Sequence, residues 1–141
     1  MKQVVELINK VKVSFMATAE GVQPRVRPMA ICVIGSGEVV IATYPSPKVE
    51  QLKSNPQVEY CVMDPETYDH ARLAGKAKLV ADKAGKKRLW EAVLPLLPHM
   101  TDYYSDPSDE GLVFVTLVPE EVLHMPRTAH EYRKVSWKRK A

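Results

Sequence analysis

The ten residues RVRPMAICVI, from Arg25 to Ile34, restrict the possible folds more than any other segment of this chain. Their apolar and β-branched side chains predict a strand. After Arg27 both faces of that strand are apolar, whereas an antiparallel strand with one face in water alternates apolar and polar residues. Pro28 has no amide hydrogen to donate, so the strand must be irregular there or lie at the edge of its sheet.

One face of this strand can fill a core, but the other face needs separate cover. The helix expected at residues 83–97 could supply it from within the chain. A second subunit could supply it instead, because a symmetric dimer with this strand at its seam, and with Ile31 in the contact, satisfies the same requirement. The residues themselves leave both arrangements open.

The rest of the chain consists of short strand patterns interrupted by a few helices. Strands are expected at residues 13–19, 25–34, 39–43, 57–63, 71–81, 112–119 and 120–125, and helices at 4–11, 47–54 and 83–97. The segment GSGE at 35–38 is typical of a hairpin turn. Charged or small residues alternate with apolar ones along 71–79, which indicates a sheet with one wet face. The pattern predicts a mainly β fold with helices, arranged as an antiparallel barrel.

Length and composition place the chain among ordinary globular proteins. Its 141 residues fit one domain, and 45% of them are hydrophobic and 26% charged. No apolar run reaches the roughly 20 residues of a membrane-spanning helix, and the first residues lack a secretory-signal pattern. Cys32 and Cys61 form no CxxC motif, so we expect free thiols in a reducing cytoplasm.

The net charge of +3 is concentrated near the end of the chain, in RKVSWKRK at 133–140. We therefore expect a globular domain over residues 1–125 and a basic tail over 126–141. A nearly neutral body argues against a broad nucleic-acid-binding face. A small barrel that binds nucleic acid through its tail remains as an alternative, and it predicts salt-dependent binding of oligonucleotides.

The segment TYPSPK, from Thr43 to Lys48, joins a predicted strand to a predicted helix and has the features of an anion site. Ser46 followed by Pro47 is typical of an N-cap and first helical position. The amides of Lys48 and Val49 would then point out of the helix start, where the helix dipole favours negative charge. The same residues also fit a plain helix cap with a solvated lysine.

Basic side chains on the neighbouring strand strengthen the anion interpretation. The hairpin at 35–38 places Arg25 or Arg27 near the level of the TYPSPK segment. A guanidinium group can hold a phosphate through two parallel hydrogen bonds. The sequence thus predicts a phosphate site made by two segments, while the choice between the two arginines stays open.

The order of four motifs, RVRPM, GSGEVVIAT, SPKVEQLKSNPQV and AGKAKLV, resembles the pyridoxamine 5'-phosphate oxidase-like FMN-binding split barrels. The similarity is greatest to the small general-stress-protein-like branch, and it covers Val4 to Pro119. It implies an antiparallel six- to seven-stranded split β-barrel that forms a homodimer, with two FMN sites at the subunit interface. The cofactor contacts that it implies come from Arg25, Arg27, Pro28, Met29, Ala30, Thr43, Ser46 and Lys48.

Two departures from the family pattern bear on the activity. Pro47 precedes a lone Lys48, where the oxidases proper carry an arginine–lysine pair. The chain ends in HEYRKVSWKRKA, without their substrate-binding segment. The expected function is therefore an FMN-dependent oxidoreductase acting on a small molecule with NAD(P)H or another reductant, and not authentic pyridoxamine 5'-phosphate oxidation. A non-catalytic flavin-binding stress protein is the alternative, and relatives of this fold that use F420 or haem leave the cofactor open.

No side chain in the sequence identifies itself as a catalytic acid or base. The histidines are scattered and have neither zinc-site nor triad spacing, so we expect no metal; they are His70, His99, His124 and His130. Tyr103 and Tyr104 lie in the long loop 100–111. They either cover a ring-shaped ligand or pack the loop.

Overall fold

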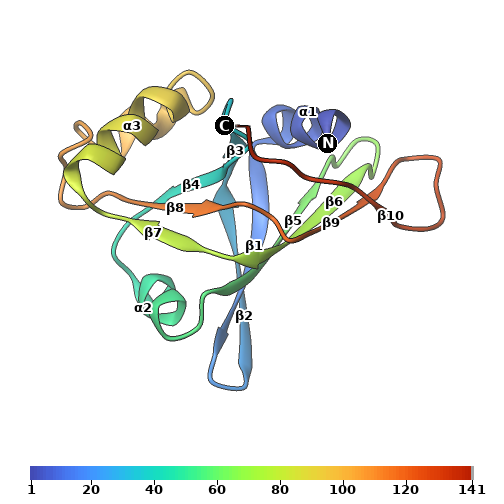
Figure 1. Cartoon of the computed structure of the whole chain (residues 1–141), viewed down its shortest axis with the longest axis horizontal. Helices are drawn as coiled ribbons and strands as arrows, with labels where there is room; N and C mark the ends of the chain where they lie inside the picture. Colours follow the sequence, from blue (N-terminus) through green and yellow to red (C-terminus); the bar gives the residue numbers. More distant parts are fainter. Residues whose placement is uncertain (141) are drawn as a thin grey trace.

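The computed structural model describes residues 1–140 and arranges their strands in two antiparallel sheets (Figure 1). The larger sheet has the order β10-β9-β6-β5-β1-β2, and the smaller has the order β3-β4-β8-β7. The predicted mainly antiparallel fold with helices is confirmed, and the described strands form two sheets, not one closed ring. The larger sheet contains β1 (Val13–Glu20), β2 (Gln23–Ala30), β5 (Gln57–Met63), β6 (His70–Lys76), β9 (Glu121–Met125) and β10 (Arg133–Lys134). The smaller contains β3 (Cys32–Val33), β4 (Val39–Thr43), β7 (Lys78–Val80) and β8 (Val113–Leu117).

Helix α1 (Lys2–Val11) covers one end of the sheets because its apolar residues recur on one face. Val4, Leu7 and Ile8 are buried on that face. The helix ends at Lys12, which adopts the left-handed conformation with φ 62° and donates its amide hydrogen to the Ile8 carbonyl at 2.8 Å. A glycine is the usual residue at such a helix end, because a side chain there costs about 1 kcal/mol.

The predicted strand 25–34 is divided between the two sheets. Residues 23–30 form β2 at the edge of the larger sheet, so the edge position predicted from Pro28 is confirmed. Ile31 donates its amide hydrogen to the Lys12 carbonyl at 3.1 Å, and the chain then enters β3. The prediction that Ile31 lies in a subunit seam is wrong, because its side chain is fully buried in the core.

The division explains why both faces of this segment are apolar. Cys32 and Ile34 pack in a cluster with helix α3 (Lys83–Val93), so a helix of the same chain covers this part. Val26, in the β2 part, is 70% exposed. The helix therefore covers only the second half of the predicted strand.

The predicted strand 71–81 is likewise divided, at Ala77, whose amide hydrogen is donated to the Pro56 carbonyl at 2.8 Å. Beside this point the two sheets approach each other closely. A Cβ atom added at Gly75 would lie 3.0 Å from Leu117 Cδ1 and 3.2 Å from the Glu120 nitrogen. The close approach of the two segments therefore favours a glycine, since an added side chain would force its neighbours to shift.

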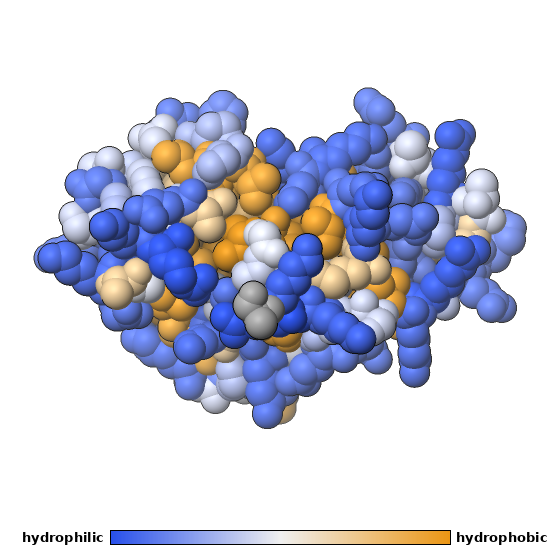
Figure 2. Space-filling model, turned by 45° about the horizontal axis from the view of Figure 1, so that its top comes forward, coloured by the Kyte–Doolittle hydropathy of each residue, from blue (hydrophilic) through white to orange (hydrophobic). Residues whose placement is uncertain are grey.

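Two hydrophobic clusters hold the sheets and helices together. One lies between the sheets and under α1, and the other lies between the smaller sheet and α3. Helix α2 (Pro47–Ser54) matches its predicted bounds and packs beside β1. On the side that carries α1 and α3, apolar side chains gather in the middle with polar ones around them (Figure 2). The helices of residues 1–140 are too short or too polar to cross a bilayer.

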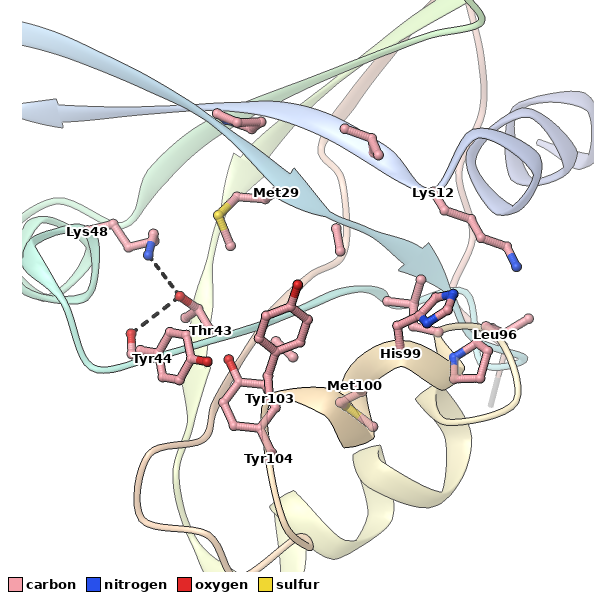
Figure 3. A pocket seen from close by; sticks show the side chains of 16 residues that line it. Lys12, Met29, Thr43, Tyr44, Lys48, Leu96, His99, Met100, Tyr103 and Tyr104 are labelled. Carbon is pink, nitrogen blue, oxygen red and sulfur yellow. Dashed lines mark hydrogen bonds between the residues drawn. The ribbon is translucent and has the colours of Figure 1, made fainter.

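Helix α3 ends four residues before its predicted end, because Pro95 cannot continue an α-helix. A turn over residues 94–96 leads into the 3-10 helix η1 (Pro98–Asp102). This turn and η1 return the chain towards the edge of β2 (Figure 3).

The basic end of the chain returns to the sheets. Strand β10 pairs with β9, and the Trp137 indole donates a hydrogen bond to the Gly37 carbonyl at 2.9 Å. Glu38 is buried and accepts hydrogen bonds from Arg88 of α3 at 3.1 Å and from Arg139 at 3.3 Å. Part of the positive charge of residues 133–140 is thus used inside the molecule.

Candidate functional site: a cationic corner beside an apolar cavity

Lys48, in the first turn of α2, closes the loop that follows β4. Its ammonium group donates to the hydroxyls of Thr43 and Ser46, each at 2.8 Å (the Thr43 bond is drawn in Figure 3). Ser46 is the N-cap residue, yet its side chain makes no capping hydrogen bond. The residues predicted from the TYPSPK spacing therefore converge on one point, with the lysine held by neutral hydroxyls.

The helix start contributes less than the sequence predicts. The amide hydrogen of Val49 is donated to the Ser46 carbonyl at 2.9 Å, so the expectation that it points free is wrong. The tight turn at Ser46–Pro47 brings this carbonyl within hydrogen-bonding distance of Val49, the third residue of the helix. Positive charge at this corner comes from side chains more than from the open helix end.

Arg27 supplies the second cation. Its guanidinium group donates to the Thr18 hydroxyl at 2.7 Å, to the Gln51 side-chain oxygen at 2.9 Å and to the Met16 carbonyl at 3.3 Å. Thr18 and Gln51 are buried, so β1 and α2 hold the guanidinium from behind. All three acceptors are neutral.

Burial and neighbouring positive charge lower the pKa of both cations. Burial, and then the charge of Arg27, lowers the pKa of Lys48 below its usual 10.5. Burial, and then the charge of Arg25, lowers the pKa of Arg27. Within residues 1–140 neither Lys48 nor Arg27 forms a salt bridge. An anion placed at this corner would therefore relieve repulsion as well as gain attraction.

Arg25 is directed elsewhere. Its Nε atom lies 3.4 Å from the Glu20 carboxylate, and both side chains are at least half exposed. Glu20 also accepts a hydrogen bond from Gln51 at 3.0 Å. Of the two candidate arginines, only Arg27 reaches the Lys48 corner directly, and Arg25 contributes charge from behind it.

A cavity of about 640 Å³ opens beside this corner, within the range of cofactor and small-molecule sites (Figure 3). Pro28, Met29 and Ala30 of β2 form one wall, and Thr43 and Lys48 close one end. Five of the eight predicted cofactor residues thus line the cavity. Ser46 and Arg27 do not line the cavity. Ser46 accepts a hydrogen bond from the lining residue Lys48, and the charge of Arg27 acts on the same lysine.

The facing wall comes from the turn after α3 and from η1. Its lining residues are Leu96, Leu97, Pro98, His99, Met100, Tyr103 and Tyr104. The ring centroids of Tyr44 and Tyr104 lie 5.1 Å apart, and those of Tyr103 and Tyr104 lie 6.5 Å apart. Tyr104 is buried, and burial raises its pKa to about 12. Tyr104 therefore packs the loop, while Tyr103 is exposed and faces the cavity.

Sequence reasoning missed several lining residues, and their signals differ. Tyr44 follows directly on the predicted strand 39–43 and could have been found from that position. Lys12 is the last residue before a predicted strand and carries no local signal. His99 belongs to η1, which follows the turn at which Pro95 ends the helix early, so only this proline pointed to it.

The remaining histidines lie outside the cavity lining. His124 is buried and pairs with Asp69 through Nε2 at 2.7 Å. His70 pairs with the Tyr132 hydroxyl at 2.9 Å. Over the described part of the chain, no group of three metal-ligating side chains comes together. The chemistry available at the cavity is binding of an anion at one end and of a flat apolar body along β2.

Comparison with known proteins gives a family and a fold. The family model described as pyridoxamine 5'-phosphate oxidase like matches residues 1–121. No protein with a curated description matches the sequence.

Solved structures share the fold at low sequence identity. A NimC/NimA family protein from Clostridium acetobutylicum is 24% identical, with a TM-score of 0.75, and the match covers 95% of this chain and 91% of that chain. General Stress Protein 26 from Bacillus anthracis is 18% identical, with a TM-score of 0.71 and coverages of 95% and 97%. A pyridoxamine 5'-phosphate oxidase-related, FMN-binding protein from Nostoc punctiforme is 17% identical, with a TM-score of 0.69 and coverages of 94% and 84%.

Proposed function

The chain belongs to the pyridoxamine 5'-phosphate oxidase-like family, and on this premise we propose that it is a cytoplasmic, homodimeric FMN-binding oxidoreductase acting on a small molecule. The observation that carries the proposal is a pair of cations held by neutral partners: Lys48 lines one end of an apolar cavity, and Arg27 lies close enough to lower the pKa of Lys48. A phosphoester tail with a planar ring is the ligand class that this arrangement suits.

The phosphate end of FMN belongs at the cationic corner. Lys48 supplies a full charge, and Thr43 and Ser46 supply hydroxyls that can turn from the lysine towards a phosphate. Arg27 stands behind them, and Arg25 adds to the positive potential from further away. Charge-assisted hydrogen bonds of this kind are about twice as strong as neutral ones.

The flavin ring belongs along β2. Because β2 is a sheet edge, part of its backbone is free of strand partners, and Pro28, Met29 and Ala30 border the cavity. The flavin, when bound, supplies the electron-transfer chemistry, and the protein binds and orients it. Tyr103 and the apolar wall of η1 exclude water from the opposite side.

An exposed apolar surface supports the homodimer. The outward faces of β1, β2 and β5 expose Val13, Phe15, Val26 and Met63. Phe15 lies opposite Pro28 on one side and Cys61 on the other. Val13 and Pro28 also line the cavity, so a second subunit seated on this surface would border the flavin.

Two free thiols support a cytoplasmic location. Cys32 and Cys61 are free, and burial raises the pKa of both thiols. A reducing compartment keeps such thiols unpaired.

The test is the colour of the purified protein and the identity of what it releases on denaturation. The expected result is visible flavin absorbance and released FMN, followed by reduction of the bound flavin by NADH or NADPH and reoxidation by an acceptor. A colourless protein that does not bind added FMN would overturn the proposal. A bound flavin that resists every reductant would leave a carrier role in place of an oxidoreductase.

A further inference from the structure

The cavity lining carries more positive charge than the binding of one phosphate requires. Three basic residues line it, namely Lys12, Lys48 and His99, and no aspartate or glutamate is among its described lining residues. Lys12 and Lys48 stand at opposite ends, with Tyr103 between them (Figure 3). If the phosphate of FMN occupies the Lys48 end, as proposed above, the Lys12 end still carries positive charge.

Lys12 is not engaged elsewhere. Its side chain is exposed, and it forms no salt bridge with any described residue. His99, its neighbour at this end, has its Nδ1 atom 3.4 Å from the Asp102 carboxylate. Lys12 is therefore the principal uncompensated charge at the second end.

The backbone holds Lys12 firmly in an unfavourable conformation. Its amide hydrogen is donated to the Ile8 carbonyl at 2.8 Å, and its own carbonyl accepts from Ile31 at 3.1 Å. With φ at 62°, the position favours glycine, yet the chain places a lysine there with its side chain at the cavity rim. Backbone strain of this kind is concentrated at binding sites.

The wall near the Lys12 end suits a flat apolar molecule placed beside the flavin. Leu96 and Met100 line the cavity on the Lys12 side of Tyr103 (Figure 3), and their side chains offer dispersion contacts. A ligand with a planar body and one acidic group would contact this surface and Lys12 together.

We propose that the substrate taken beside the flavin is a small aromatic carboxylate, whose carboxylate group pairs with Lys12. This assignment rests on the proposed flavin function and adds the substrate class to it. Lys12 acts in recognition and takes no part in electron transfer.

Calorimetric titration with benzoate, and with its neutral isostere benzamide, tests the assignment on the protein as purified and saturated with FMN. The variants are Lys12→Met, which removes the charge, and Lys12→Arg, which keeps it. Lys78→Met, at an exposed position of β7 that does not line the cavity, is the matched control for loss of one lysine.

The expected result is that the wild type binds benzoate about tenfold more tightly than benzamide. Lys12→Met should lose this preference, while Lys12→Arg and Lys78→Met should keep it. The visible flavin absorbance should be equal in all four proteins, because Lys12 lies away from the phosphate corner.

Three results would overturn the assignment: no binding of either probe, equal binding of both by the wild type, or an unchanged preference in Lys12→Met. Loss of flavin from Lys12→Met would also overturn it, since Lys12 would then hold the cofactor. If the wild type proves to bind no FMN, the flavin proposal fails on its own colour test. The benzoate titration still reports whether the Lys12 end selects a carboxylate.

Discussion

The Lys48 ammonium lies 2.8 Å from the Thr43 hydroxyl, so the first turn of α2 is tied to the last residue of β4 by a lysine that no described carboxylate neutralises. Arg27 approaches the same corner from β2, and burial followed by the charge of Arg27 lowers the pKa of this lysine. Two segments, β2 and the connection from β4 to α2, thus place positive charge near one end of the cavity.

Replacing Lys48 with methionine should weaken FMN binding by at least about tenfold, because it removes one of the two charges at the phosphate. Flavin-free protein is titrated with FMN, and the quenching of flavin fluorescence gives the dissociation constant. Lys78→Met is the control and should bind FMN normally. Equal dissociation constants for Lys48→Met and wild type would remove Lys48 from the phosphate site.

Phe15 and Ile31 should respond in opposite ways to a lysine substitution. Phe15 is 51% exposed on the outward sheet face, so Phe15→Lys should give folded monomers. Ile31 is fully buried, so Ile31→Lys should unfold the protein. Sedimentation velocity reports the first effect and thermal melting the second. A dimeric Phe15→Lys protein would place the subunit contact on another surface.

Gly75→Ala should lower the free energy of unfolding by about 1–3 kcal/mol, because its methyl group would press on Leu117 and on the Glu120 backbone. Gly35→Ala is the control, since nothing lies within 4 Å of a Cβ atom there. Urea denaturation measures both. A Gly75→Ala protein as stable as the control would show that the sheets can separate here at little cost.

Lys12→Gly should raise the free energy of unfolding by about 1 kcal/mol, because glycine adopts positive φ without strain. Tyr68, with φ 61°, is a second such site outside the cavity, and Tyr68→Gly should be stabilised similarly. Urea denaturation compares them with the wild type. Under the carboxylate proposal only Lys12→Gly loses benzoate selectivity, so a loss in Tyr68→Gly would argue against it.

The Lys10–Asp64 pair should make stability depend on pH in the acid range. The Lys10 ammonium lies 2.8 Å from the Asp64 carboxylate, and this hydrogen bond, followed by the Glu66 amide, holds the pKa of Asp64 below its usual 3.8. A depressed carboxyl pKa stabilises the fold above the unfolded value and loses that effect as the pH falls through the folded value. Asp64→Asn should therefore be less stable than the wild type at neutral pH.

Urea unfolding of wild type and Asp64→Asn, repeated from about pH 7 to about pH 2, checks this dependence. The difference between the two proteins should shrink below about pH 4 and vanish once the wild-type carboxylate is protonated. A difference that stays constant over the whole range would mean that Asp64 stabilises the fold without its charge.

Sequence patterns predicted those helices and strands whose ends are set by neighbouring residues in the chain. Helix 47–54 and strand 57–63 have their predicted bounds, because a Ser–Pro start and an Asn–Pro stop delimit them within the chain. The division of strand 25–34 was not predictable from the strand itself. It depends on the hydrogen bond that the Ile31 amide donates to the carbonyl of Lys12, a residue at the end of α1. Alternation also predicts equal roles for Arg25 and Arg27, and only their tertiary contacts separate them: Arg25 pairs with Glu20, and Arg27 bonds to Thr18 and Gln51.

The same reasoning applies to the site. The cationic corner lies within one turn of sequence and one hairpin, so spacing alone could indicate it. The facing wall depends on where α3 ends and how the chain after Pro95 folds back, which no short segment specifies. The Lys12 end is a product of tertiary structure alone.

The position of Pro28 within β2 affects how readily a monomer aggregates before it meets a second subunit. An uncovered edge strand is a template on which other molecules can add strands and begin aggregation. Proline offers no amide hydrogen, so an incoming strand could not pair continuously along residues 23–30. The residue that borders the cavity therefore also protects newly folded monomers from fibril-like stacking.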